Sequence, residues 1–351
     1  MAFYSELAPT DKVTGTAIVT SGIWQDGVSN ITTFFTSSTQ YTNTGDYSID
    51  IYRYDPQTNA SASVQFGVAY GHVGGSGSLG TKGATGDRTT AAVYGQINNM
   101  INPPNTTRFK FGGKSDVDQV YAIVINRARL REKLQPGSWE LHLHSAGGAG
   151  STKVKLIDDY DSAPGGTTNQ RNFAPEYNVV SGTLSGGTTV STEASDESST
   201  TGTYGTFYPS LGIILLNPKR LQVIPGVDSG GAGLATVSAS NTDNRNDRLL
   251  YNTIKSGSYF QAKRQEQITS RHYFIRAAAG QFNSTTNETY YTQSVAGTRL
   301  VIPGLRTDPK TFITTVGLYN ENNELLAVAK LSKPILKSKS REALIKVKLD
   351  F

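Results

Sequence analysis

The last forty residues carry the clearest alternation of hydrophobic and polar positions in the chain. Residues 311–319 predict a strand, residues 320–324 a polar turn, and residues 325–331 the returning strand of a hairpin that Ser332-Lys-Pro334 is expected to end. After a basic loop, polar residues alternate with Ile345, Val347, Leu349 and Phe351, which is the period of a strand with one solvated face. The pattern predicts that this terminal segment is docked into a sheet.

Short strands are predicted through most of the remaining chain. The expected strands are residues 13–20, 47–54, 63–70, 118–125, 139–144, 153–157, 212–216, 271–276 and 298–302. Residues 139–144 and 153–157 are expected to pair through the turn at Gly147-Gly-Ala-Gly150. Helical spacing before Pro103-Pro104 predicts a helix over residues 90–101, and shorter helical segments are expected at 126–134 and 261–269.

Two long stretches, residues 158–204 and 228–247, are rich in Ser, Thr, Gly, Asn and Asp. Because such a composition buries little apolar surface, we expect residues 158–204 to be a long loop on a neighbour or a flexible insertion. The predicted domains are a β-rich domain at 1–157, polar insertions around a core strand (207–216) at 158–250, and a β domain at 251–351 that ends in the terminal strand.

Composition supports a mainly β fold, with two or more β-sandwich-like domains, long polar loops and a few short helices. The chain has 36 Gly, 18 Tyr and 13 Phe among 351 residues, and only 17% of its residues are charged. It has no cysteine, which excludes disulfides and thiolate metal sites. The first residues show neither a basic nor an apolar signal region, and no window approaches eighteen apolar residues, so we expect no secretory signal and no membrane helix.

The formal charge of +5 is concentrated near the C-terminus. Residues 331–351 hold six basic residues against Glu342 and Asp350, a local charge of +4. A basic strand and loop of this kind has three interpretations: a solvated face or protected sheet edge, a surface for a protein partner, or a nucleic-acid contact. We expect this segment to supply the candidate assembly contacts, which are Lys337, Lys339, Arg341, Lys346 and Lys348.

Several motifs were weighed for chemistry. The glycine-rich passage 71–83 lacks the Gly-Lys-Ser/Thr triplet of a phosphate loop, and Asp158-Asp-Tyr-Asp161 lacks the spacing of an EF-hand. His142 and His144 share a strand face but have no further histidine near them in sequence. No Gly-x-Ser-x-Gly elbow is present, although a pair of glycosidase carboxylates stays open because such residues can be distant in sequence. We therefore expect no enzymatic activity, no cofactor and no metal site.

Several passages together resemble virion structural proteins of large contractile-tailed phages, especially phages of cyanobacteria. The passages are Tyr70-Gly-His-Val-Gly-Gly-Ser-Gly-Ser78, Ala92-Val-Tyr-Gly-Gln96, residues 121–134 with Gly137-Ser-Trp-Glu-Leu141, Ser270-Arg-His-Tyr-Phe-Ile-Arg276 with Gln281-Phe-Asn-Ser284, and Val316-Gly-Leu-Tyr-Asn320 with residues 325–334. The resemblance leaves out the two polar stretches and carries over no catalytic residue.

The resemblance implies a structural component of the phage tail, in the baseplate wedge, that acts by protein–protein assembly. Its partners would be other tail or baseplate proteins, with several copies per particle, no membrane and no nucleic acid. It would be assembled in the host cytoplasm and reside in the virion. The alternatives are a carbohydrate-binding or depolymerising tail protein, for which the 18 Tyr and the β-rich composition speak, and a neck protein that contacts nucleic acid through the basic tail.

Overall fold

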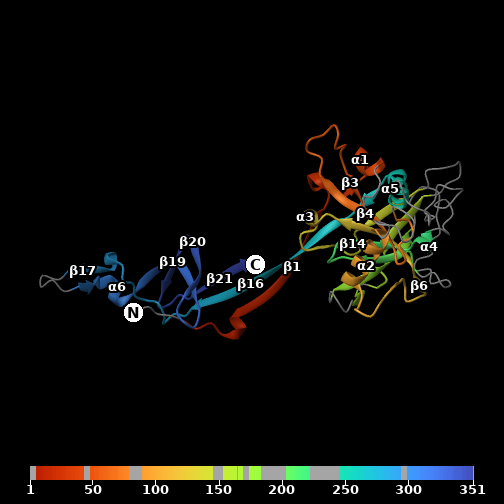
Figure 1. Ribbon diagram of the computed structural model, residues 1–351. Coiled ribbons are helices and arrows are strands. Elements are labelled where there is room, and N and C mark those ends of the chain that lie inside the picture. Colours follow the sequence, from red (N-terminus) through yellow and green to blue (C-terminus); the bar gives the residue numbers. More distant parts are fainter. Residues whose placement is uncertain are drawn as a thin grey trace. The chain divides into compact units, whose positions relative to one another are not determined.

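The computed structural model confirms a mainly β fold, with 46% strand and 19% helix (Figure 1). The helix content lies below the average share of globular proteins. The structure describes residues 5–42, 48–78, 89–144, 153–163, 165–168, 174–182, 203–221, 245–293 and 299–350.

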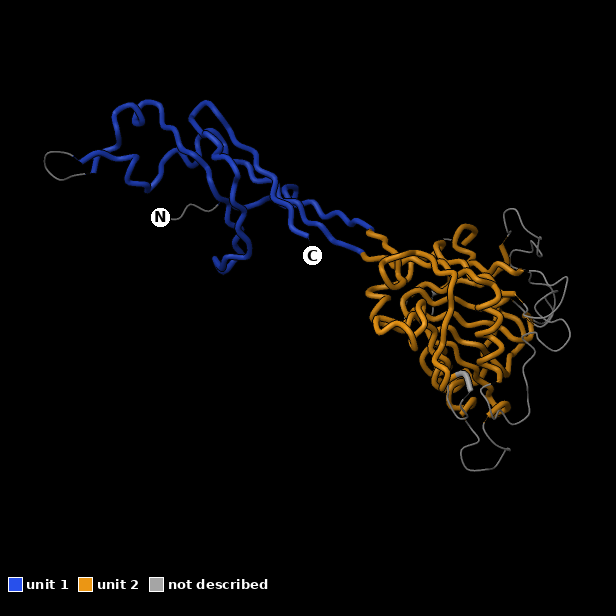
Figure 2. Tube along the Cα trace, turned by 90° about the horizontal axis from the view of Figure 1, so that it is seen from above, with its two compact units in different colours: residues 1–18, 267–351 blue, residues 19–266 orange. Residues whose placement is uncertain are grey.

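The chain divides into two compact units (Figure 2). Unit 1 comprises residues 1–18 and 267–351, and unit 2 comprises residues 19–266. The boundaries fall inside strands β1 (Lys12–Gly22) and β16 (Lys263–Ala277). The boundaries expected from composition, after residues 157 and 250, lie elsewhere, because polar loops mark interruptions of the sequence pattern rather than the limits of a core.

Unit 2 is built on one large antiparallel sheet. Its main path runs in the order β2 (Asn30–Ile31), β15 (Phe260–Gln261), β9 (Glu140–Leu143), β10 (Val154–Asp158), β12 (Pro175–Gly182), β13 (Gly205–Tyr208), β14 (Ile213–Leu216), β7 (Gln119–Ile125), β4 (Val64–His72) and β3 (Ile49–Tyr52). The pairing of Leu141 with Leu156 confirms that β9 and β10 are neighbours, as expected; their connection, residues 145–152, lies outside the described part.

Smaller elements complete unit 2. The short strands are β11 (Thr167–Thr168) beside β12, β5 (Phe109–Lys110) paired with β6 (Asp116–Val117), and β8 (Lys133–Leu134) beside β16. The helical segments are η2 (Gln25–Gly27), α1 (Ser38–Thr42), α2 (Thr89–Ile101), α3 (Arg127–Leu130), α4 (Pro218–Leu221) and α5 (Arg245–Gly257).

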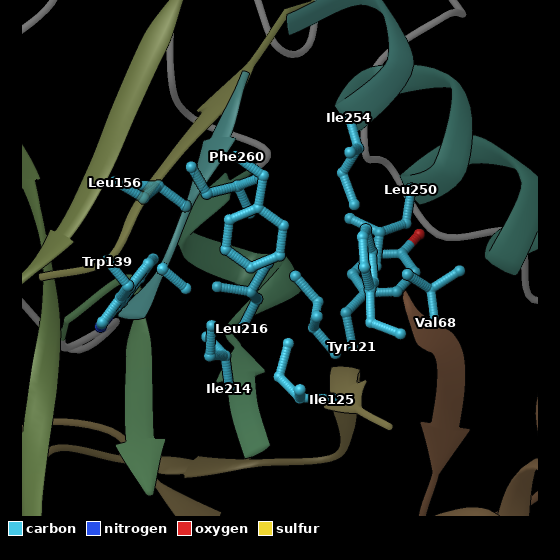
Figure 3. Close-up of a cluster of buried hydrophobic side chains, with 14 of the residues drawn as sticks. Val68, Tyr121, Ile125, Trp139, Leu156, Ile214, Leu216, Leu250, Ile254 and Phe260 are labelled. Atoms are coloured by element: carbon cyan, nitrogen blue, oxygen red, sulfur yellow. The ribbon is translucent and has the colours of Figure 1, made fainter. Parts of the chain in front are cut away.

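The large sheet curls around its main core. Phe260 of β15 and Phe66 of β4 stand near opposite ends of the strand order, yet their ring centroids lie 5.2 Å apart. Trp24 packs against both rings, at 4.8 Å and 5.8 Å. Helix α5 contributes Leu250 and Ile254 to the same core, on the side facing Phe260 (Figure 3). Burial of these side chains supplies the main driving force for folding of unit 2.

A second cluster covers the other face of β7 and β14. Val120, Ala122, Ile213 and Leu215 pack with helix α2, whereas the residues alternating with them point into the first core. Strands buried on both faces have no polar face, which explains why residues 118–125 and 212–216 read as continuous apolar runs. The predicted helix at residues 90–101 is confirmed as α2.

Gly71 of β4 lies directly beneath helix α2. A Cβ atom at this position would lie 2.9 Å from the backbone nitrogen of Tyr94. The close approach of the helix explains one residue of the glycine-rich passage by packing. Residues 79–83 of that passage lie outside the described part.

Three expectations from the sequence are wrong. The polar stretch 158–204 contains the core strand β12, whose Tyr177, Val179 and Val180 are buried between β10 and β13. Residues 261–269 belong to strands β15 and β16 and are not helical. The segment expected to be helical at 126–134 is helical only over α3, and Lys133–Leu134 form β8. The rest of the long insertion, residues 183–202, and residues 222–244 lie outside the described residues.

Unit 1 holds the expected hairpin and terminal strand. The hairpin pairs β19 (Lys310–Tyr319) with β20 (Leu325–Ser338), and the terminal strand β21 (Ala343–Asp350) pairs with β16 in the sheet order β1-β16-β21. The remaining elements are η1 (Pro9–Asp11), η4 (Glu288–Tyr290), β17 (Tyr291–Gln293) paired with β18 (Arg299–Val301), and α6 (Pro303–Thr307).

The expected break at Ser332-Lys-Pro334 is a bulge and not the end of the strand. Pairing passes from Thr315 opposite Lys330 to Ile313 opposite Ile335, so residues 331–334 have no partner in β19. Proline is tolerated at a bulge because its missing N–H is not required there. Strand β20 therefore continues to Ser338.

Candidate assembly surface

Lys337 is the one residue among the five expected assembly contacts that is buried. Its exposed fraction is 0%. The ammonium group donates to the carbonyl oxygen of Ala279 at 3.1 Å and to Oδ1 of Asn283 at 2.8 Å. A buried charge is tolerated when such bonds satisfy it. Lys337 therefore ties the end of β20 to the loop after β16 and does not offer its charge to a partner.

The other four expected contacts are exposed on unit 1. Lys339 and Arg341 lie between β20 and β21, and Lys346 places its ammonium 5.7 Å from the ring centroid of Phe274. The ammonium of Lys348 lies 3.0 Å from Oδ1 of Asp350. Because an exposed ion pair of this kind is weak, Lys348 stays available to an acidic partner.

The carboxyl groups beside these cations are held in their ionised form. A hydrogen bond from Ser270 and a second one from Lys348 lower the pKa of Asp350. A hydrogen bond from Arg276, with the field of Lys337 adding to it, lowers the pKa of Glu342. Local pairing therefore offsets part of the positive charge on this face.

The terminal strand has the two-faced character expected from its alternation. Ile345 and Val347 are buried and pack with Val316 of the hairpin, whereas Lys346 and Lys348 are exposed. Leu349 is partly buried against the same cluster, and Phe351 lies outside the described residues. The described part of the strand is docked.

The outer face of the hairpin carries apolar side chains that the sequence analysis did not single out. Val316, Leu318 and Ala329 face the core, so the residues alternating with them face outward. On this outward side, a Cβ at Gly317 would lie 2.8 Å from the Tyr319 ring and 3.3 Å from a methyl group of Leu325. We call the exposed side chains of this side the hairpin patch; they are Phe312 (64% exposed), Tyr319 (44%), Leu325 (53%) and Val328 (58%).

A sequence signal for the hairpin patch exists in Leu325-Leu-Ala-Val-Ala329. These residues are apolar at both odd and even positions, although a hairpin lying on one core needs apolar side chains on one face only. Such a run leaves apolar side chains on the face of the hairpin that is turned away from the core. The sequence analysis predicts this segment only as the returning strand of the hairpin.

Unit 1 has few buried hydrophobic residues. Among the described residues, six hydrophobic residues of unit 1 are buried, compared with forty-four in unit 2. The six are Ala277, Tyr290, Val316, Ala343, Ile345 and Val347. Because burial of apolar surface must offset the conformational entropy of ordering the chain, so small a core gives unit 1 less stability of its own than the larger core gives unit 2.

The net charge is confined to the same unit. Unit 1 contains thirteen Lys and Arg against eight Asp and Glu, and unit 2 contains twenty of each. The difference of +5 in unit 1 equals the formal charge of the whole chain. Unit 1 thus combines a small core, an exposed apolar face and the excess positive charge.

A cluster of polar side chains lies on the outward side of β9 and β10 in unit 2. Glu140 accepts from His142 at 2.6 Å and lies 2.8 Å from the Lys155 ammonium, while the His142 ring stacks on Tyr259 at 4.7 Å. Burial would raise the pKa of Glu140, but the hydrogen bonds from His142 and Lys155 outweigh it and lower this pKa. The group is an internally paired ion network on the outward side of β9 and β10.

The acidic run after β10 has structural partners. Both carboxylate oxygens of Asp158 accept from the backbone N–H of Gly137, at 3.0 Å and 2.8 Å. Burial nevertheless raises the pKa of Asp158 to about 6. Asp159 binds the backbone and side-chain nitrogens of Asn178, both at 2.9 Å. These carboxylates hold β10 to a turn and to β12.

Comparisons with known proteins give no relative: no family model, no curated protein and no solved structure matches this chain. Within the described residues, no group of three or more His, Asp or Glu is placed to hold a metal ion. No helix in the same part of the chain has both the length and the apolar character needed to cross a bilayer.

Proposed function

We propose that this chain is a structural subunit of a contractile phage tail, located in the baseplate, that works through protein–protein contacts without catalysis. The observation that carries the assembly role is unit 1, whose described part has six buried hydrophobic residues beneath an exposed apolar face, and which holds all of the net positive charge. The tail assignment rests on the sequence resemblance, whose passages lie in both units. The partners would be other tail proteins and further copies of this chain.

The position of the chain in virions tests the proposal. Cryo-electron microscopy of particles, with an antibody against this chain as the label, should place several copies in the baseplate. Density at the outermost tail tip would favour the carbohydrate-binding alternative, and density at the portal would favour the nucleic-acid-contacting alternative. Absence of the chain from purified virions would contradict the structural role.

A further inference from the structure

We propose that the hairpin patch binds the hairpin patch of a second copy of this chain. The two hairpins would pack face to face and run antiparallel, related by a two-fold axis. This inference builds on the proposed assembly role, since it names one partner of that surface. It is nevertheless decided by measurements on the purified chain, which are independent of where the chain lies in a virion.

The burial pattern shows that the hairpin is a layer with one uncovered side. Its inner side packs through Val316 against Ile345 and Val347 of β21. Its outer side exposes about half or more of each of four large apolar side chains, among them Phe312 at 64% and Val328 at 58%. Adding a second hairpin would repeat the layering that β19 and β20 already make with β16 and β21.

The distribution of charge along the hairpin favours a second copy, in antiparallel orientation, as the occupant. The turn is acidic, with Glu321 and Glu324, whereas the strand beyond Val328 is basic, with Lys330 and Lys333. In an antiparallel pair with Val328 near the axis, the acidic turn of each copy lies over the basic segment of the other. A two-fold contact must be self-complementary, and this arrangement meets that condition.

Hydrogen bonds within the turn hold an acidic side chain in place. Asn320 Oδ1 accepts from the backbone nitrogens of Asn322 and Glu324, and Asn320 Nδ2 donates to Glu324 Oε2 at 2.6 Å. These bonds fix the Glu324 carboxylate at the end of the hairpin. A carboxylate held in place loses less entropy when it meets a cation of another chain.

The expected contact is weak. Two strands of about ten residues cover roughly 300 Å², well below the roughly 800 Å² per partner of a standard interface. Excess positive charge elsewhere on unit 1 also opposes association, and added salt relieves that repulsion. Self-association should therefore depend on concentration, and it becomes effective when neighbouring contacts in an assembly hold the copies together.

Single-cysteine cross-linking of the full chain tests the pairing directly, because the natural sequence has no cysteine. Val328→Cys, treated with a short bis-maleimide, should give a covalent dimer several-fold faster than Leu344→Cys. Leu344 is a matched control, since it is 68% exposed but lies on β21. Equal rates for the two variants at the highest soluble concentration overturn the proposal.

Charge exchange separates the proposed orientation from a non-specific apolar contact. In the Val328→Cys chain, Glu324→Lys or Lys333→Glu alone should slow cross-linking several-fold, because an axis near Val328 brings Glu324 of one copy beside Lys333 of the other and each change places like charges opposite one another. The double exchange should restore the rate. If the double variant is as slow as the sum of the two single effects predicts, the antiparallel pairing is wrong.

Discussion

Lys337 is a buried charged residue in a basic segment whose other cations are exposed. Its ammonium makes two hydrogen bonds to Ala279 and Asn283 and is fully buried, although its neighbours in sequence are exposed. Lysine is normally solvated, so nothing in the sequence distinguishes Lys337 from Lys339. Only the register of β20 reveals which of them points inward.

Replacing Lys337 should therefore destabilise unit 1. Lys337→Met leaves the Ala279 carbonyl and the Asn283 side chain without their donor, which we expect to cost about 1–3 kcal/mol. Lys339→Ala, at an exposed position, should change stability by less than about 0.5 kcal/mol. Chemical denaturation of the two variants gives the comparison, and equal stabilities would contradict a structural role for Lys337.

Asp247 of α5 is a buried carboxyl whose contribution to the stability of the fold depends on pH. Burial raises its pKa well above the ordinary range, although a hydrogen bond from the Tyr70 backbone N–H acts in the opposite direction. Among the described residues, no donor reaches its Oδ1. The folded state therefore holds the carboxyl proton of Asp247 more tightly than the unfolded state does. The stability that this proton contributes is complete at acidic pH and is lost as pH rises above the pKa of Asp247 in the unfolded chain.

Asp247→Asn should remove this dependence. The amide keeps an acceptor for the Tyr70 N–H and has no charge to bury, so the variant should gain stability relative to the natural chain as pH rises. The gain within the titration window is about 1.4 kcal/mol per pH unit. Urea unfolding from acidic to neutral pH, monitored by tryptophan fluorescence, measures the difference; parallel pH profiles for both chains would refute this account.

At the scale of elements, the terminal strand is a structural part of unit 1. Ile345 and Val347 lie against Val316, and burying such a side chain contributes about 1.5–3 kcal/mol. Deleting residues 345–351 should therefore give insoluble or unassembled protein. Lys346→Ala combined with Lys348→Ala should leave folding intact and weaken assembly in a salt-sensitive way. A truncated chain with an unchanged melting temperature would show that the docking contributes nothing.

Elements with one buried and one solvated face were predictable from the sequence. Strand β21 and helix α2 each show a clear period, since a single interface decides which positions are apolar. Strand β16 was missed between Lys263 and Ser270 because most of its residues there are partly exposed, which leaves the sequence without alternation. Strand β12 was missed because its short apolar core, Tyr177 to Val180, lies in a segment dominated by Ser, Thr and Gly.

The candidate surface was only partly predictable. Charge density indicated the unit that holds the excess positive charge and four cations that are exposed, because charged residues stay at the surface by default. The hairpin patch was missed because an apolar side chain reads as core in a single sequence. The partner that would cover it is not encoded in the local pattern.

At the scale of the whole molecule, the difference in core size between the units should be visible in thermal unfolding. Among the described residues, unit 2 has forty-four buried hydrophobic residues and unit 1 has six, so we expect two calorimetric transitions, with unit 1 unfolding first. If copies associate through unit 1, its transition should rise with protein concentration while that of unit 2 stays fixed. One transition, independent of concentration, would contradict this division.

The position of the unit boundaries in the chain determines when each unit can form during synthesis. Unit 2 is complete once residue 266 has emerged from the ribosome. Unit 1 can form only after strand β21 has been synthesised, because it combines residues 1–18 with residues 267–351. Domains generally fold as they emerge. The surface proposed for assembly therefore appears last, and a chain that terminates early would carry a folded unit 2 without a competent unit 1. Under the proposed assembly role, translation would delay association until unit 1 has formed and would keep chains without unit 1 out of the assembly.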